Sequence, residues 1–266
     1  MPQSSTNVPY MSLSKFFFPT RHKCYCCGNP VKTFLPYKAG QKSRSSFIKE
    51  LDVIGSDVEN FSCPICHCHD RERHLLMYFD ELDLWHSIAN QAVLHIAPEN
   101  TLKRRISDLK PSQYIQGDYA PASTEIEKID ICELPYSDNT FDFILCNHVL
   151  EHVSDDVIAM QELFRVLKIG GFAVIQTPFS AILANTFVDA NITSDELRRK
   201  FYGQEDHVRV FGNDLFTKLE NAGFQLQIKH HQISLKNLDA KYYGVNEREP
   251  LILVTKQPLT SISENP

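Results

Sequence analysis

The stretch that decides the fold runs from Phe141 to Gly171 and reads FDFILCNHVLEHVSDDVIAMQELFRVLKIGG. Its first part, Phe141 to Cys146, is apolar enough to predict a strand that is buried on both faces. Ser154 is a favourable N-cap for a helix, and Gly170-Gly171 predicts its end, with Lys168 in the last turn. Four apolar residues recur at helical spacing between these limits: Val157, Met160, Phe164 and Leu167. A buried strand followed by an amphipathic helix is typical of a parallel sheet covered by helices.

Strand-like and helix-like segments alternate on both sides of this unit, which predicts an α/β domain. A second helix is expected over Asp214 to Ala222, with Gly223 as its stop. Six further strands are expected: Ala92 to Ala97, Gln113 to Gln116, Ile126 to Ile131, Phe172 to Thr177, Phe224 to Ile228 and Leu251 to Thr255.

The cysteines predict a metal centre ahead of this domain. Six of the eight cysteines fall in two clusters, and each cluster holds a Cys-x-x-Cys pair. Two residues between thiolates allow both sulfurs to reach one tetrahedral ion, and four thiolates leave no position for water. We therefore expect a structural Zn²⁺ in a zinc-ribbon-like module, held by Cys24, Cys27, Cys63 and Cys66. Two alternatives stay open: a ligand set that includes His67 or His69, and reduced cysteines without metal.

These patterns divide the chain into a flexible tail at 1–22, a zinc-binding module at 23–72, the α/β domain at 73–256 and a second tail at 257–266. The chain has 266 residues, of which 42% are hydrophobic, which is enough for one large core and a small module. No apolar run approaches the roughly 20 residues of a membrane span, and the start does not resemble a signal peptide. Reduced cysteine clusters make the cytoplasm the expected location.

The charge of the chain is unevenly distributed. The net charge of −6 argues against a protein coated for nucleic acid. Yet residues 1–49 contain eight Lys or Arg residues and no Asp or Glu. This basic segment is either a solvated surface or a site for an anionic acceptor or partner.

Three motifs carry a resemblance to a known family. Residues 134–142 (LPYSDNTFD), 147–153 (NHVLEHV) and 165–171 (RVLKIGG) resemble the class I S-adenosylmethionine-dependent methyltransferases, in particular the small-molecule "type 11" group. The resemblance implies a Rossmann-like, seven-stranded, mostly parallel sheet with helices on both faces and an antiparallel last strand. It also implies a cofactor, S-adenosylmethionine, above the carboxyl ends of the first four strands.

The resemblance assigns cofactor-binding roles to several residues. Asp118 matches the acid that bonds the ribose hydroxyls, although a turn-capping role is the alternative. The segment His95 to Glu99 departs from the family's glycine-rich motif, because Glu99 would repel the methionine carboxylate unless it pairs with the ammonium group. The full set of expected cofactor contacts is His95, Ala97, Glu99, Asp118, Asp130, Ile131, Asn147 and His148.

Methyl transfer from a sulfonium requires alignment of the acceptor and, for a hydroxyl or ammonium acceptor, a base. We expect His207 to be that base, with Asp206 to orient it and Arg209 to hold an anionic group of the acceptor. In the alternative, His207 and Arg209 only brace their loop. The long segment from Phe179 to Tyr202 is expected to form a lid over the acceptor.

The expected function is thus methyl transfer to an O or N atom of a small-molecule or carrier-linked acceptor. One alternative is an RNA methyltransferase whose basic zinc module binds RNA, and another is a non-catalytic, zinc-organised scaffold. A metal pair at His148 and His152, with Glu151 between them, is explained better by the family motif. The sequence indicates no oligomeric state.

Overall fold

The computed structural model describes residues 21–258, so most of the two predicted tails lies outside the described residues. Its centre is a seven-stranded sheet with the strand order β10-β11-β8-β7-β4-β5-β6. The strands β4 to β8 run parallel, whereas β11 is antiparallel to both of its neighbours. The strands span β4 (Ala92–Ile96), β5 (Gln113–Asp118), β6 (Glu127–Lys128), β7 (Phe141–Asn147), β8 (Leu167–Gln176), β10 (Gln225–Lys229) and β11 (Leu251–Thr255). The predicted Rossmann-like sheet with its antiparallel last strand is confirmed.

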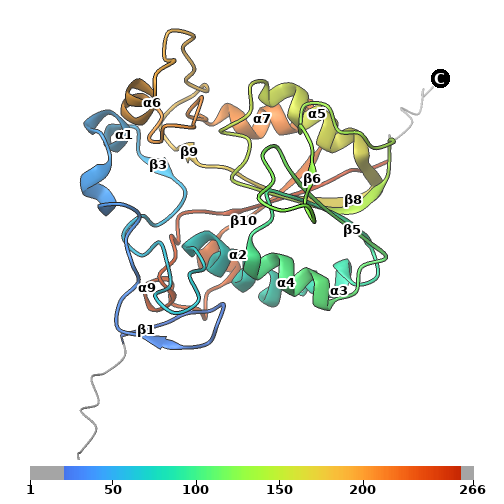
Figure 1. Cartoon of the computed structure of the whole chain (residues 1–266), viewed down its shortest axis with the longest axis horizontal. Helices are drawn as coiled ribbons and strands as arrows, with labels where there is room; N and C mark the ends of the chain where they lie inside the picture. Colours follow the sequence, from blue (N-terminus) through green and yellow to red (C-terminus); the bar gives the residue numbers. More distant parts are fainter. Residues whose placement is uncertain (1–20, 259–266) are drawn as a thin grey trace, which may run out of the picture.

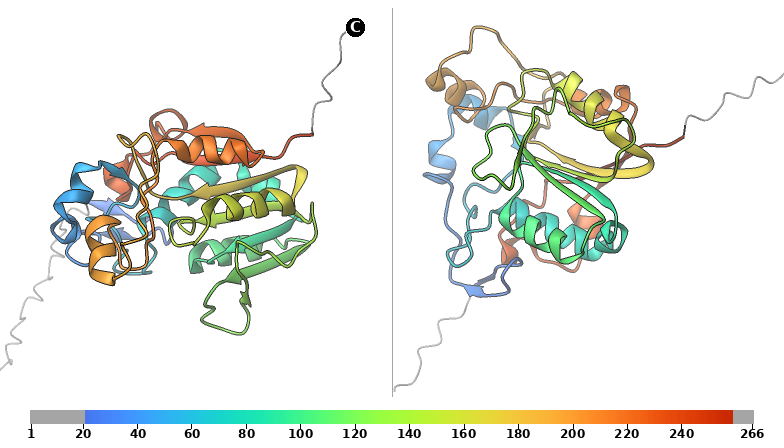
Figure 2. Two further views of the ribbon diagram at one scale, coloured as in Figure 1. Left: turned by 90° about the horizontal axis from the view of Figure 1, so that it is seen from above. Right: turned by 45° about the vertical axis from the view of Figure 1, so that its right-hand side comes forward.

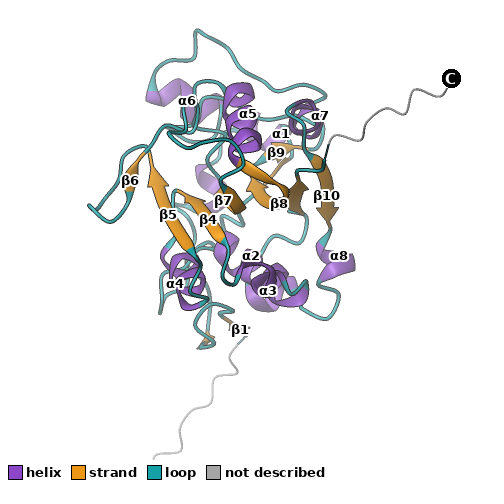
Figure 3. Cartoon of the chain, turned by 90° about the vertical axis from the view of Figure 1, so that its right-hand side faces the viewer, coloured by secondary structure: helices purple, strands orange, loops and turns teal. Residues whose placement is uncertain are grey.

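Helices cover both faces of the sheet (Figures 1 and 3). One face carries α2 (Asp70–Glu81), α3 (Leu84–Ile88) and α4 (Asn100–Asp108), and the other carries α5 (Asp156–Val166) and α7 (Asp214–Asn221). Alternate residues of β4 feed two separate cores: Leu94 and Ile96 pack beneath α5 and α7, whereas Val93 packs beneath α2 and α4. The central strands are therefore buried on both sides, as their apolar composition predicts.

The helix after β7 is shorter than predicted at both ends. Its N-cap is Asp155, not Ser154, because the Asp155 carboxylate accepts hydrogen bonds from the backbone of Val157 and Ile158. It ends at Val166, before the two glycines, since Leu167 already pairs with Phe141 in the sheet. Strand β8 therefore begins at Leu167 and passes through the glycine pair.

Smaller boundary shifts have local causes. The prediction that Lys168 lies in the last helical turn is wrong, because this residue belongs to β8. Its ammonium group lies 2.8 Å from the Asp142 carboxylate. Strand β4 ends one residue early, since Ala97 adopts a positive φ of 49°. Strand β6 keeps only two of the six residues predicted between Ile126 and Ile131.

The N-terminal module contains β1 (His22–Lys23), β2 (Pro30–Val31), the 3-10 helix η1 (Gly40–Ser43), α1 (Ser46–Glu50) and β3 (Val53–Ile54). Strand β3 pairs antiparallel with β9 (Phe179–Ser180) of the main domain. Helix α1 lies beside α6 (Asp195–Phe201), and β1 lies beside α9 (Ala240–Tyr243), which follows α8 (His231–Ser234). Figure 2 shows the module and α6 together at one end of the sheet.

The predicted boundary at residue 72 falls within helix α2, which runs unbroken from the module into the main domain. Within residues 21–258, no helix is both long and apolar enough to cross a membrane.

Candidate functional site

The four cysteines of the predicted zinc centre converge. One sulfur each from Cys24, Cys27, Cys63 and Cys66 lies within 4.8 Å of all the others. The sulfurs of Cys24 and Cys66 are 3.7 Å apart. Zn–S bonds of about 2.3 Å place tetrahedral sulfurs about 3.8 Å from one another. The donor set and its spacing therefore fit a zinc ion.

The two Cys-x-x-Cys turns have the same backbone structure. In the first, the amide of Gly28 donates to the carbonyl of Cys24, and in the second His67 donates to Cys63, at 2.9 and 3.0 Å. Gly28 and His67 both adopt positive φ angles, of 70° and 60°. Each turn thus presents its two sulfurs in the same way, which supports the predicted ligand set.

A rival set of sulfurs lies beside this centre. Cys24, Cys26 and Cys68 also converge, with the sulfurs of Cys24 and Cys68 3.4 Å apart. Among the described residues, neither cysteine cluster includes His67 or His69. The imidazole of His69 instead stacks on Phe61, with ring centroids 4.2 Å apart.

The loop after β4 turns tightly where the family has its first glycine. Ala97 occupies the left-handed region, and its amide donates to the carbonyl of Gly117 at 2.8 Å. For a residue other than glycine, this conformation costs roughly 1–2 kcal/mol of free energy. The turn is therefore formed despite the missing glycine, and it leads directly to Glu99, the N-cap residue of α4.

Glu99 is held by polar groups from three elements. Nε2–H of His95 donates to Oε2 of Glu99 at 3.2 Å, and the amide of Asn147 donates to Oε1 at 2.5 Å. Nε of Arg71 lies 3.8 Å from the same Oε1. Burial alone would raise the pKa of Glu99, but the hydrogen bond from His95 and the charge of Arg71 outweigh it and lower the pKa. A buried, charged carboxylate thus stands where β4 and β7 end.

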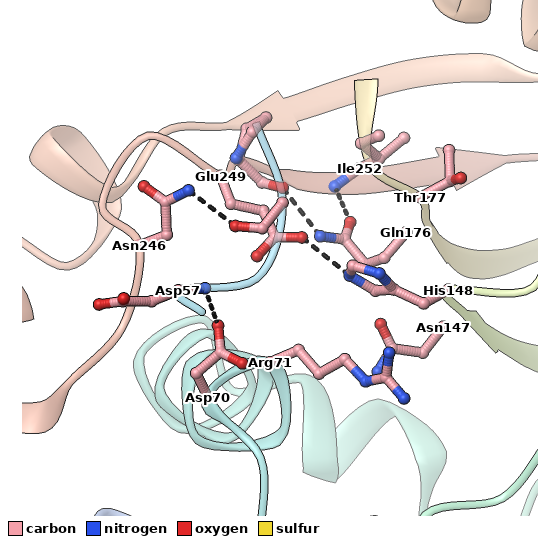
Figure 4. Close-up of polar contacts among 12 residues, drawn as sticks. Asp57, Asp70, Arg71, Asn147, His148, Gln176, Thr177, Asn246, Glu249 and Ile252 are labelled. Carbon is pink, nitrogen blue, oxygen red and sulfur yellow. Dashed lines mark hydrogen bonds and ion pairs between the residues drawn. The ribbon is translucent and has the colours of Figure 1, made fainter. Parts of the chain in front are cut away.

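Sequence reasoning missed Arg71. Its side chain extends from α2 toward Asn147 (Figure 4). The only signal was its place directly after the second cysteine pair, at the start of a helix. Nε of Arg71 and Oδ1 of Asn147 are buried without a hydrogen-bond partner. Buried polar groups are rarely left unpaired. One unpaired donor and one unpaired acceptor at this position fit a bound zwitterion, which offers a partner to each.

The expected ribose and adenine contacts lie along the same edge of the sheet. Asp118 ends β5, and one of its carboxylate oxygens accepts from the amide of Ala120 at 2.8 Å. Asp130 accepts in the same way from Cys132, and the side chain of Ile131 is buried. Both aspartates thus stabilise turns, and each retains a second carboxylate oxygen.

His148 lies between two carboxylates. Its Nδ1 is 3.4 Å from Glu151, and its Nε2 is 3.0 Å from Glu249, as Figure 4 shows for the second contact. Burial opposes the charged imidazolium, but the hydrogen bonds to Glu151 and Glu249 outweigh it and raise the pKa of His148 to about 9. Glu249, 101 residues away in the chain, was not predicted.

A cavity of about 450 Å³ lies next to this edge of the sheet. Its walls come from the segment between the cysteine pairs, from the loop after β7 and from residues 199–210. Five cationic side chains line it, against the acids Glu151 and Asp206: Lys38, Arg44, Arg71, Arg199 and Arg209. A wider hollow of about 1010 Å³ lies between α1 and α8–α9, but no residue at the carboxyl ends of β4 to β7 lines it. The smaller cavity is therefore the candidate acceptor site.

His207 presents a free nitrogen in this cavity. Its side chain is 6% exposed, and its Nδ1 lies 3.1 Å from the carbonyl of Tyr202. A carbonyl only accepts, so Nδ1 carries the proton and Nε2 carries a lone pair. This Nε2 is buried without a partner, and burial lowers the pKa of His207. Tyr202 thus supplies the orienting contact predicted for Asp206, whose carboxylate lies 3.3 Å from Nδ1 of His152.

Arg209 makes the contacts of a brace. Its guanidinium donates to the carbonyls of Leu150, Val153 and Ser154 at 2.6–3.0 Å. This is the alternative considered for Arg209, in which it fixes the loop after β7. Arg44 and Arg199 make no side-chain hydrogen bond among the described residues.

The comparison with protein families agrees with this geometry. Residues 89–175 match Methyltransf_11, described as a methyltransferase domain. The match contains β4, β5, β7 and most of β8. Over these residues the chain is similar to a methyltransferase domain.

Individual relatives match shorter segments. The chain is 35% identical to an uncharacterized protein of Methanocaldococcus jannaschii over 89 residues, which are 33% of this chain and 39% of that protein. It is 47% identical to the demethylmenaquinone methyltransferase of Staphylococcus carnosus over 45 residues, or 17% and 19% of the two chains. The matches thus span less than half of these relatives. Among solved structures, the YcgJ protein of Bacillus subtilis is 16% identical, with a TM-score of 0.46, and the similarity covers 70% of this chain and all of that one.

Proposed function

We propose that this protein transfers a methyl group from S-adenosylmethionine to an O or N atom of a small, anionic acceptor. The observation that carries the proposal is that a charged cluster at the sheet edge lies directly beside the cationic cavity. The charged cluster of Arg71, Glu99 and Asn147 stands at the end of β4 and β7, and Arg71 also lines the cationic cavity that holds His207. A donor site and an acceptor site therefore share one wall.

The chain offers a partner for each part of the cofactor. When the cofactor is bound, the guanidinium of Arg71 would hold its methionine carboxylate, and the carboxylate of Glu99 would hold its ammonium group. This arrangement turns the repulsion expected from Glu99 into an attraction, because Glu99 meets the cationic half of the zwitterion. Asp118 would accept hydrogen bonds from the ribose hydroxyls. Asp130 and Ile131 would hold the adenine, and Asn147 and His148 the methionine portion.

The bound cofactor supplies an electrophilic methyl group on a sulfonium, whose sulfur keeps the electron pair of the broken bond. The protein then contributes alignment, exclusion of water and proton transfer. Nε2 of His207 takes the proton that the acceptor loses when its lone pair forms the new bond to carbon. The free cations Arg44 and Arg199 hold an anionic group of the acceptor, while Arg209 fixes the loop.

The test is calorimetric titration of the full chain with S-adenosylhomocysteine, with the zinc content measured on the same sample. We expect binding in the micromolar range and one zinc ion in the cysteine centre. A screen of small carboxylates and phosphate monoesters with radiolabelled cofactor then seeks the acceptor. His207→Gln is expected to bind the cofactor normally and to lose turnover, whereas His86→Gln, at an exposed position on α3, keeps both.

The absence of binding at millimolar S-adenosylhomocysteine would overturn the proposal and favour the non-catalytic scaffold. Binding to RNA that weakens steeply with salt would favour the RNA methyltransferase instead.

A further inference from the structure

Three potential metal ligands converge in the acceptor cavity. Glu151, His152 and His207 each offer one ligand atom, and these atoms lie within 4.8 Å of one another. All three residues line the cavity of about 450 Å³. Glu151 and His152 follow β7. His207 lies in the loop between α6 and α7, close to Phe211, which forms a bridge to Phe179 of β9. The fold therefore brings distant parts of the chain together.

The hydrogen bonds of the two histidines fix which nitrogen faces the cluster. Nδ1 of His152 lies 3.2 Å from the carbonyl of Asp206, and Nδ1 of His207 lies 3.1 Å from the carbonyl of Tyr202. Carbonyl oxygens only accept, so both Nδ1 atoms carry protons and both Nε2 atoms carry lone pairs. Histidine ligands of metals are typically held in this way, with the second nitrogen donating to a carbonyl or carboxylate.

The carboxylate of Glu151 is oriented in the same manner. Its side chain is buried, and its Oε2 accepts from the hydroxyl of Thr177 at 2.9 Å. Its other oxygen, Oε1, lies 3.4 Å from Nδ1 of His148 and 3.9 Å from Nε2 of His152. An ion at this site would therefore share Oε1 with His148.

An unpartnered atom points independently to a ligand. Nε2 of His207 is buried and has no hydrogen-bond partner, although the side chain is only 6% exposed. A buried polar atom left without a partner costs about 1–3 kcal/mol. An ion bound by this lone pair would remove that cost.

We propose that Glu151, His152 and His207 bind a divalent transition-metal ion at a second site, separate from the cysteine centre. Two imidazoles and one carboxylate suit zinc or iron(II), and they leave coordination positions open. These positions face the cavity, where an oxygen or nitrogen of the acceptor could bind the ion. With an ion bound, Nε2 of His207 would serve as a ligand in place of its role as the base, and the ion would lower the pKa of the acceptor group bound to it.

The experiment measures metal stoichiometry in the full chain, so it does not depend on methyl transfer. The protein is dialysed against excess Zn²⁺, freed of loose ions by gel filtration and analysed for metal. We expect two zinc ions per chain for the wild type. His152→Ala and Glu151→Gln are expected to hold one, and His86→Ala, the matched control at an exposed site, two.

Cobalt distinguishes the two sites by spectroscopy. Thiolate ligands give Co²⁺ an intense charge-transfer absorption, whereas a site of nitrogen and oxygen ligands gives only weak bands. Co²⁺ added to protein with a zinc-filled cysteine centre should give the weak bands alone, and His152→Ala should abolish them. His152 is half-exposed, so this variant is expected to fold even if a substitution at the buried His207 does not.

A wild-type stoichiometry of one zinc ion, or two ions retained in His152→Ala, would overturn the inference. Two ions in a protein that fails to bind S-adenosylhomocysteine would leave this site in place and refute the proposed function instead.

Discussion

Oε2 of Glu99, which stands where the family carries a glycine, lies 3.2 Å from Nε2 of His95. The pair explains how an acid can occupy this position. His95 is fully buried in β4 and contacts one carboxylate oxygen, while Nε of Arg71 lies 3.8 Å from the other. Five predictions test this site and the structure around it.

Glu99→Gln should weaken binding of S-adenosylhomocysteine by roughly 10-fold, because a hydrogen bond to a charged group contributes about 1.5 kcal/mol or more. Binding of methylthioadenosine, which lacks the amino-acid portion, should not change. Calorimetry with both ligands checks this. Equal affinity of wild type and variant for S-adenosylhomocysteine would show that Glu99 does not meet the ammonium group.

Arg71→Gln should have the same pattern, since the guanidinium is assigned to the methionine carboxylate. We expect a loss of roughly 10-fold or more for S-adenosylhomocysteine and none for methylthioadenosine. Arg105→Gln, on the exposed face of the neighbouring helix α4, is the control and should bind both ligands normally. A loss of affinity for both ligands in Arg71→Gln would indicate a structural role.

Asp118→Asn should weaken both ligands, because both contain the ribose. The asparagine oxygen can still accept from the amide of Ala120, so the turn is preserved and only the charge is removed. A decrease of roughly 10-fold is expected for a lost charged hydrogen bond. Unchanged affinity for both would leave Asp118 with its turn-capping role alone.

Cys63→Ser and Cys68→Ser separate the two sulfur sets of the ribbon. Cys63 begins the turn that matches the turn at Cys24, so its loss should release the zinc ion and lower the thermal midpoint of unfolding. Cys68→Ser should retain zinc. Cys132→Ser is the control and should also retain zinc, because Cys132 is remote from both cysteine clusters in the sequence and its thiol donates to the carbonyl of Asp155. Zinc loss in Cys68→Ser with retention in Cys63→Ser would reverse the assignment.

The buried His74 should make the protein sensitive to mild acid. Burial lowers the pKa of His74 to about 3, against an ordinary value of 6.5. Between these values the unfolded chain binds a proton that the folded protein does not, so stability falls as pH decreases from 6.5. The slope for one such group is at most about 1.4 kcal/mol per pH unit.

His74→Gln should reduce this slope while keeping a donor for Nδ1 of His231, which lies 2.9 Å from Nε2 of His74. Urea unfolding between pH 7 and pH 4 measures it, with His86→Gln as the exposed control. An identical slope in wild type and His74→Gln would locate the acid sensitivity elsewhere.

The parts of this structure that follow from local pattern were predictable. Apolar strands, amphipathic helices and the Cys-x-x-Cys pairs each depend on residues close in the chain, and the sheet and the sulfur cluster follow from them. The helix end after β7 was not predictable from its glycines, because pairing of Leu167 with Phe141 begins the next strand first. Competition between a helix and a strand depends on a neighbour outside the local sequence.

Some site residues that depend on distant packing were missed for a related reason. Arg71 reaches Glu99 because α2 packs beside β4, and Glu249 reaches His148 from the segment just before β11, which only β8 separates from β7. The contacts of Arg209 could not be inferred from its charge. Three backbone carbonyls accept hydrogen bonds from its guanidinium, which also lies 3.5 Å from the Asp156 carboxylate.

The pairing of β3 with β9 gives the cysteine module an influence beyond its own fold. The segment between the two cysteine pairs is hydrogen-bonded to the main domain, and the same segment lines the candidate acceptor cavity. Removal of residues 21–72 would therefore open this cavity along one side. If the cavity holds the acceptor, exchange of this module between related chains would also change acceptor preference. Oxidation of the cysteine thiolates would therefore disturb the wall of the candidate acceptor cavity, although it would modify no residue of the proposed cofactor site.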